Sequence, residues 1–168
     1  MRRALTLLAP FVLVLATAAP ASAAPPTREP FQPLFVEFAP FEVCDFAVRI
    51  ETTELNAKSI TFDRRDGQFR QNLNGRIVEM ATNLETGASA TFNSSGPGKV
   101  WLNEAGHVVA RFGGSSLIFF FDGDVTGRGL LYMTGGGAEL EIGDGGFFYS
   151  RVEFPAHVVD VCALLSAD

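Results

Sequence analysis

Two glutamates at alternate positions are the residues of this chain best spaced for acid–base chemistry. Glu139 and Glu141 share one face of a predicted strand. Strand geometry puts them about 7 Å apart, within the range of the two carboxyl groups of an inverting glycosidase. Ala138, Leu140 and Ile142 occupy the opposite face. Since an apolar face packs on a core, we expect the glutamates to face water, and a secreted hydrolase ranks third among the functions considered.

Other residue types that serve catalysis or metal binding occur without the neighbours that such chemistry requires. His107 and His157 are the only histidines, and the sequence contains no Gly-x-Ser-x-Gly elbow. The run Asp122-Gly123-Asp124 resembles a fragment of a calcium loop, but the EF-hand spacing is absent and a hairpin turn is the better interpretation. The sequence therefore predicts no catalytic residue, no metal site and no cofactor.

The first two dozen residues predict export. Arg2 and Arg3 precede an apolar run from Leu5 to Leu15. Ala21-Ser22-Ala23 then has the small-residue pattern at which signal peptidases cut. We expect residues 1–23 to be a signal peptide and the mature protein to be secreted and extracellular.

Charge and hydropathy argue against two kinds of partner. The predicted signal peptide carries two of the 13 basic residues and none of the 19 acidic ones, so its removal changes the formal net charge from −6 to −8. An acidic surface repels a phosphate backbone. Beyond the signal peptide, no apolar run has the length that a bilayer requires. We expect neither nucleic-acid binding nor a membrane span.

The two cysteines, Cys44 and Cys162, predict a disulfide, because export leads to an oxidising compartment. Cys44 comes just before the first clear strand, and Cys162 lies at the end of the last one. The bond would bring the two ends of the domain together. A catalytic thiol or a metal ligand is the alternative, and no pattern of neighbouring residues supports either.

Short alternating runs between turn residues predict an all-β fold. Phe46, Val48 and Ile50 point to one side of a strand, and this alternation recurs in roughly nine to eleven segments. Turn pairs such as Asn74-Gly75 reach the positive φ angles of tight hairpins. Short loops make successive strands antiparallel, which predicts a meander. Because the disulfide joins its ends, we expect the meander to close into a small β-barrel, with a β-sandwich as the alternative.

Composition divides the chain into three parts. Residues 1–23 are the predicted signal peptide. Residues 24–43 are rich in proline and phenylalanine, and the prolines favour an extended leader over a helix. Residues 44–168 have the size of a single β domain.

Four features of the chain occur together: the Arg-Arg, alanine-rich signal, Cys44 before a strand, Gly96-Pro97-Gly98 in the middle, and Val159-Asp160-Val161-Cys162 near the end. With these features the chain resembles small secreted β-rich proteins of actinobacteria over most of its mature length. The shared pieces are structural, and the group has no assigned activity. The resemblance therefore implies a compartment and a fold class only.

The frequent phenylalanines, 16 in all, suggest the function. In the run from Leu117 to Phe121 both faces of the predicted strand are apolar. One face fills a core, and the other must meet the leader, a second subunit or a ligand. We expect a non-catalytic binding or structural module that acts through an exposed aromatic surface on another protein or in a homodimer.

The alternative function is an extracellular carrier. A barrel of about eight strands holds one small hydrophobic molecule in its interior. On this hypothesis the ligand-binding side chains are large and apolar, and they are Met80, Trp101, Phe119, Phe121 and Tyr132.

Overall fold

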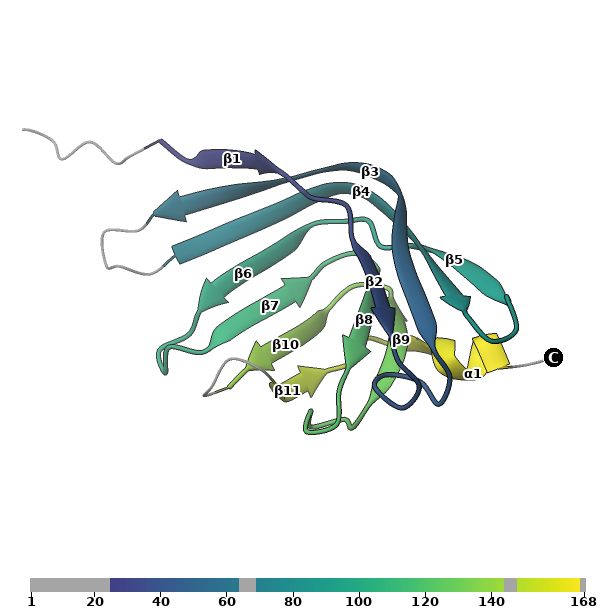
Figure 1. Cartoon of the computed structure of the whole chain (residues 1–168). Coiled ribbons are helices and arrows are strands. Elements are labelled where there is room, and N and C mark those ends of the chain that lie inside the picture. Colours follow the sequence, from purple (N-terminus) through teal and green to yellow (C-terminus); the bar gives the residue numbers. More distant parts are fainter. Residues whose placement is uncertain (1–24, 64–68, 144–147, 167–168) are drawn as a thin grey trace, which may run out of the picture.

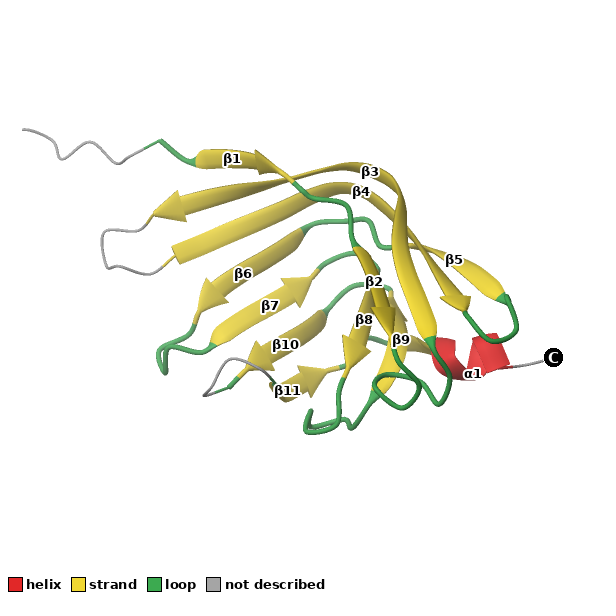
Figure 2. Cartoon of the chain, viewed as in Figure 1, coloured by secondary structure: helices red, strands yellow, loops and turns green. Residues whose placement is uncertain are grey.

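The computed structural model describes residues 25–63, 69–143 and 148–166, which fold almost entirely into strands (Figures 1 and 2). The elements follow in this order: β1 (Thr27–Pro30), β2 (Phe35–Phe38), β3 (Val48–Asp63), β4 (Phe69–Asn83), β5 (Ser89–Asn93), β6 (Gly98–Leu102), β7 (Val108–Phe112), β8 (Ser116–Phe120), β9 (Gly129–Thr134), β10 (Ala138–Ile142), β11 (Tyr149–Glu153), β12 (His157–Asp160) and α1 (Val161–Ser166). All pairs between these strands are antiparallel, as predicted.

The long hairpin of β3 and β4 is the base of the larger sheet. One half of β3 pairs with β2 and the other with β1, while the two halves of β4 pair with β5 and β6. The hairpin bends between its halves, where the register shifts between Thr52 and Glu54 (Figure 1). From β6 the sheet continues through β7 and β10 to β11. The extended segment before Cys44 thus contributes two strands to this sheet.

A second sheet has three strands in the order β12-β9-β8, and it packs against the larger sheet in two places, on β2–β5 and on β10–β11. Alternate residues of β8 belong to two different cores. Leu117 and Phe119 pack in a cluster that contains Ile50 of β3, whereas Phe120 packs in a second cluster with Leu140 of β10. Both apolar faces of β8 are therefore covered within the chain.

The predicted closed barrel is wrong. The larger sheet is an open path that ends at β11, and the described strands form two stacked sheets of sandwich type. The meander is interrupted because the β8–β9 hairpin leaves the larger sheet and β7 pairs directly with β10. Closure was inferred from the disulfide, but that bond joins the two sheets to each other and not the two edges of one sheet.

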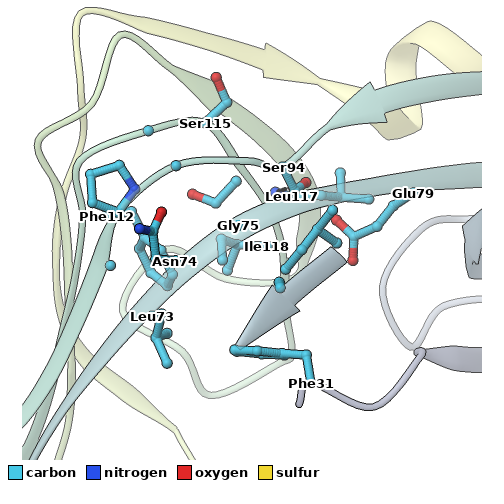
Figure 3. Close-up of a pocket in the computed structure, with 17 residues that line it drawn as sticks. Phe31, Leu73, Asn74, Gly75, Glu79, Ser94, Phe112, Ser115, Leu117 and Ile118 are labelled. Carbon is cyan, nitrogen blue, oxygen red and sulfur yellow. Dashed lines mark hydrogen bonds between the residues drawn. The ribbon is translucent and has the colours of Figure 1, made fainter. Parts of the chain in front are cut away.

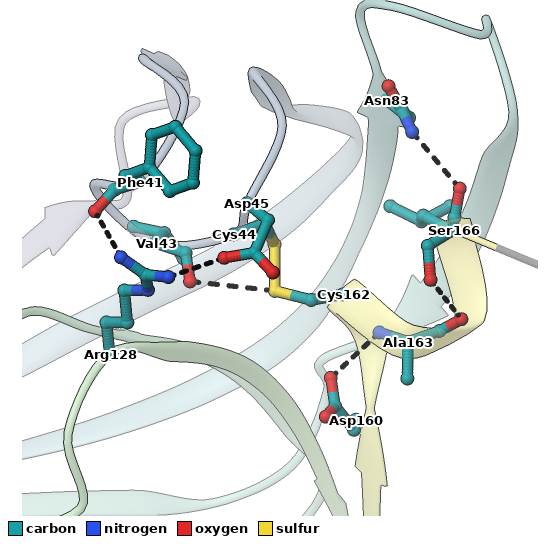
Figure 4. The surroundings of a disulfide bond; sticks show 11 residues. Phe41, Val43, Cys44, Asp45, Asn83, Arg128, Asp160, Cys162, Ala163 and Ser166 are labelled. Atoms are coloured by element: carbon teal, nitrogen blue, oxygen red, sulfur yellow. Dashed lines mark hydrogen bonds and ion pairs between the residues drawn. A yellow bond between two sulfur atoms is a disulfide. The ribbon is translucent and has the colours of Figure 1, made fainter.

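The predicted disulfide between Cys44 and Cys162 is present, with Cα atoms 5.4 Å apart (Figure 4). Cys44 lies in the loop before β3, and Cys162 lies in α1, directly after β12 of the small sheet. Asn83, at the end of β4, donates its amide to the carbonyl of Leu165 at 3.2 Å. The helix is thus attached to the larger sheet at both of its ends.

The loop before β3 is also attached to the β8–β9 loop, through Arg128. This guanidinium donates to the Phe41 carbonyl at 3.3 Å and pairs with Asp45 at 2.5 Å (Figure 4). It also lies 5.3 Å from the centre of the Phe41 ring, in cation–π geometry. Phe41 itself has a φ of 70°, a value that non-glycine residues rarely adopt.

Candidate functional site

Three of the five predicted ligand-binding residues lie in the core around Phe38 and Phe92. The rings of Phe119 and Phe121 lie 5.0 and 5.8 Å from that of Phe38, and the Tyr132 ring lies 4.9 Å from that of Phe92. The Tyr132 hydroxyl donates to the carbonyl of Asn93 at 3.0 Å. These three aromatic side chains pack against the core, and none of them is among the residues that line the cavity described below.

The other two predicted ligand-binding residues lie on the outer face of the larger sheet. Met80 stands opposite Glu51 and Thr91, on the face of β4 away from the buried Ala81. Trp101 stands opposite Arg70 and Val109 on neighbouring strands. The structure does not bring the five predicted residues together.

The predicted carboxylate pair on β10 belongs to an ion-paired group. Arg151 of β11 pairs with Glu139 at 2.5 Å and approaches Glu141 at 3.8 Å. Glu141 also contacts His107 Nδ1 at 2.7 Å and accepts from Asn103 at 3.1 Å. The hydrogen bond to His107 is the main cause that lowers the pKa of Glu141. An inverting glycosidase needs one carboxyl group held protonated, and the surroundings of Glu141 act in the opposite direction.

The Asp122-Gly123-Asp124 run forms a turn in which one aspartate has a structural role. Asp124 is buried, and its two carboxylate oxygens accept from the backbone amides of Phe121 at 2.6 Å and Tyr149 at 2.5 Å. This carboxylate attaches the β8–β9 turn to β11. Among the described residues, no group of three or more His, Cys, Asp or Glu side chains is arranged to hold a metal ion.

The best candidate site is a cavity of about 150 Å³ between β4, β6 and the start of β8 (Figure 3). Its lining is mostly apolar. The polar residues of the lining include Glu79, Ser94 and Ser116, which are described below. The residues that line it are Phe31, Ala57, Leu73, Asn74, Gly75, Ile77, Glu79, Ser94, Gly96, Pro97, Gly98, Phe112, Gly114, Ser115, Ser116, Leu117 and Ile118. Phe31 comes directly after β1, so the predicted leader forms part of the wall.

The alternation of β4 supplies one side of this cavity. Leu73, Gly75, Ile77 and Glu79 occupy every second position and share the face that ends at the buried Ala81. The opposite face of β4 carries a second apolar alternation, which includes Val78 and Met80. Because both sets contain apolar residues, the period alone does not identify the inner face.

Two loops that contain glycine form another side of the cavity, and their backbones lie very close to each other at Gly96 and Gly114. A Cβ on Gly96 would contact the Cα of Gly114, so neither loop accommodates a side chain at these positions. Gly113 donates its amide to the Pro97 carbonyl at 2.7 Å, and Ser115 donates to the Ser95 carbonyl at 3.2 Å. The Gly96-Pro97-Gly98 segment therefore shapes the site in addition to making a turn.

Glu79 is a buried carboxyl group in these apolar surroundings, only 8% exposed. Burial raises its pKa, and a hydrogen bond from Ser94 acts against that rise. The Ser94 oxygen also accepts from the Leu117 amide at 3.1 Å. Figure 3 shows Glu79, Ser94 and Leu117 together on one side of the site and Leu73 and Asn74 on the other.

Ser116 supplies a second buried polar group on the cavity wall. Its hydroxyl oxygen is inaccessible and has no hydrogen-bond partner within the described residues. Such an atom is rare in folded proteins, and it indicates strain or a missing partner. Ser116 follows Gly113-Gly114-Ser115, a run typical of turns, and its burial is explained by the cores on either side of β8.

Comparison with protein-family models, with curated proteins and with solved structures finds no match to this chain. No helix within the described residues is long and apolar enough to cross a membrane.

Proposed function

We propose that this chain is an exported binding protein that takes a small, largely apolar molecule, or the apolar end of a larger one, in the cavity between β4, β6 and β8. The observation that carries the proposal is the cavity itself. An apolar cavity of about 150 Å³ accommodates a molecule the size of benzene. A few convergent polar groups in an apolar pocket are typical of ligand sites.

The secreted location is part of the same proposal. The sequence pattern of residues 1–23 predicts export, and the disulfide between Cys44 and Cys162 fits an oxidising compartment. N-terminal sequencing of the protein from its host's culture medium tests this step. A chain that starts near Ala24 supports export, and a chain found only inside cells, with residues 1–23 intact, contradicts it.

A titration with toluene, followed by amide chemical shifts, tests binding in the cavity. We expect saturable shifts at residues of the wall, and at least about tenfold weaker binding by the Ile77→Trp variant, since the indole fills the space. Ile60→Trp is the matched control, because Ile60 stands opposite Asn72 and Arg28 and does not line the cavity. Equal toluene binding by wild type and Ile77→Trp would place the ligand elsewhere and contradict the proposal.

Native mass spectrometry of the protein recovered from culture medium tests for a natural ligand. An extra mass that leaves on unfolding identifies the bound molecule. An apo monomer that also gives no toluene shifts contradicts binding in the cavity.

Surface binding through Phe41 is a second candidate function. Phe41 is 61% exposed, and it is the only non-glycine described residue with a positive φ. Strained backbone of this kind clusters at functional sites. Phe41→Gly removes the ring and still permits this φ. If the loop binds a partner or a second copy, the variant keeps its unfolding midpoint and loses that complex in sedimentation velocity. If the wild type also sediments as a monomer at every concentration and captures nothing, the second candidate fails.

A further inference from the structure

Glu79 is the only charged side chain among the residues that line the cavity. Its cross-strand neighbours are Thr52 on β3 and Phe92 on β5. Ser94 and Leu117 adjoin it from the β5–β6 loop and β8. None of these residues carries a charge, and no ion pair of Glu79 occurs within the described residues. The carboxyl group therefore has no cationic partner there.

The hydrogen bonding of Ser94 determines how Glu79 is presented. The Ser94 oxygen accepts from the Leu117 amide at 3.1 Å, and Ser94 also lies beside Glu79, where it acts to lower the pKa of the carboxyl group. Two carboxyl oxygens offer about four acceptor positions, and the single proton of a serine hydroxyl fills at most one of them. The carboxyl group keeps acceptor capacity for a ligand in the cavity.

A buried carboxylate without a partner is costly, and a proton or a cation relieves that cost. The chain itself supplies no cation at this site. An ammonium group carries only donors, so it complements a carboxylate acceptor, whereas a ligand carboxylate would add a second negative charge. The net charge of −6 also attracts cations to the protein as a whole.

We propose that the ligand of this cavity is a small amine, whose ammonium group pairs with Glu79 while its apolar body packs against Leu73, Ile77 and Ile118. This inference rests on the proposed function, because it names the ligand class of the same cavity.

The inference makes a specific prediction about pH. Burial holds the pKa of Glu79 above its ordinary value, so the fraction of ionised carboxylate in the empty cavity rises with pH above about 4.5. A protonated amine binds the ionised form. Amine binding therefore strengthens as the pH rises, whereas a neutral ligand that accepts a hydrogen bond from the protonated acid binds more weakly.

Three probes of nearly the same size test the ligand class: benzylamine, benzyl alcohol and benzoate. Each is titrated into the full mature protein between pH 4.5 and 8, with amide chemical shifts as the readout. Benzylamine stays protonated over this range. We expect it to bind at least about tenfold more tightly than benzyl alcohol at pH 8, the size of effect that a hydrogen bond to a charged group gives. Benzoate should bind most weakly.

The Glu79→Gln variant isolates the carboxylate, with Glu85→Gln, at an exposed site, as the matched control. Glu79→Gln should lose the tenfold preference for benzylamine and its pH dependence while it retains benzyl alcohol binding. Glu85→Gln should behave as wild type. The pH dependence of the wild type serves as an independent test if Glu79→Gln fails to fold.

The outcomes separate this inference from the proposed function. Benzyl alcohol binding as tightly as benzylamine, or a preference that survives in Glu79→Gln, overturns the amine proposal and leaves the cavity as a ligand site. If none of the three probes nor toluene gives saturable shifts, the proposed function itself fails.

Discussion

Gly75 of β4 stands opposite Ala57 of β3, between the two halves of the long hairpin, and the two backbones are too close there for a side chain on Gly75. A Cβ at this position would contact the Cα of Ala57 and the carbonyl oxygen of Asn56. Its φ of +143° is also one that other residues rarely adopt. Since both residues line the cavity, the shape of the cavity depends on this contact.

The first prediction concerns this contact. Gly75→Ala should lower the free energy of unfolding by at least about 2 kcal/mol, because strain at φ and the clash with the Ala57 backbone act together. Gly87→Ala is the control, since Gly87 has a φ of +80° but no atom within 4 Å of its Cβ position. It should cost only about 1 kcal/mol. Urea unfolding measures both, and equal losses would show that the close contact contributes nothing.

The second prediction uses the buried carboxyl group of Glu79. Burial raises its pKa in the folded state above 4.5, the ordinary value that holds in the unfolded chain. Between these two pKa values the folded protein binds more protons than the unfolded one, so the free energy of unfolding falls as the pH rises through this window. The Glu79→Gln variant has no carboxyl group at this position, so it lacks the part of the fall in the free energy of unfolding that Glu79 causes.

Urea unfolding of wild type and Glu79→Gln from pH 4 to pH 8 measures the difference. The variant should gain stability relative to wild type as the pH rises above about 4.5. Glu85→Gln, at an exposed site, should show no such trend. A constant difference between wild type and Glu79→Gln over this range would show that the carboxyl titrates alike in the folded and unfolded states.

Local patterns in the sequence predicted the parts of the fold that depend on neighbouring residues. The alternation of Val48 and Ile50 on β3 is confirmed, since both are buried, while Phe46 is buried but precedes the strand. The disulfide is also confirmed. The alternation follows from the period of the side chains along a strand, and the disulfide follows from the export that the signal sequence predicts, so both can be predicted from a single sequence.

The closed barrel and the cavity depend on pairings that no local pattern specifies. The β8–β9 hairpin leaves the meander and later pairs with β12, more than twenty residues along the chain. The clusters that contain Ile50 and Leu140 cover the two faces of β8, which explains why Phe119 and Phe121 pack against the core and do not form a binding surface. Glu79 was missed because Val78 and Met80 present an equally apolar alternation on the other face of β4.

The third prediction concerns the unpartnered hydroxyl of Ser116. Removing a buried polar group that has no partner recovers its desolvation cost, so Ser116→Ala should raise the free energy of unfolding of the empty protein by about 1 kcal/mol. Ser89→Ala, at an exposed position of β5, should change it by less than about 0.5 kcal/mol. A loss of stability in Ser116→Ala would mean that the hydroxyl has a partner, such as an ordered water.

The last prediction concerns the disulfide between Cys44 and Cys162, which are 118 residues apart in the sequence. It separates the effect of this bond on the unfolded chain from its local attachment of the small sheet. A closed loop of this length stabilises a fold by up to about 4–5 kcal/mol in the chain-entropy model. The Cys44→Ala, Cys162→Ala double variant should lose up to that amount in urea unfolding. Reduction of the wild type should give the same midpoint, and the same reductant should leave the variant unchanged.

Hydrogen exchange tests whether the bond also attaches the small sheet locally. The cross-link is the covalent connection between α1 and the loop before β3, in addition to the hydrogen bond from Asn83 to the Leu165 carbonyl and the packing of Val161 and Leu165 in the core. Amides of α1 and β12 should therefore lose protection in the double variant well before those of β3 and β4. A uniform loss of protection across both sheets would instead show that the disulfide acts through the unfolded chain alone.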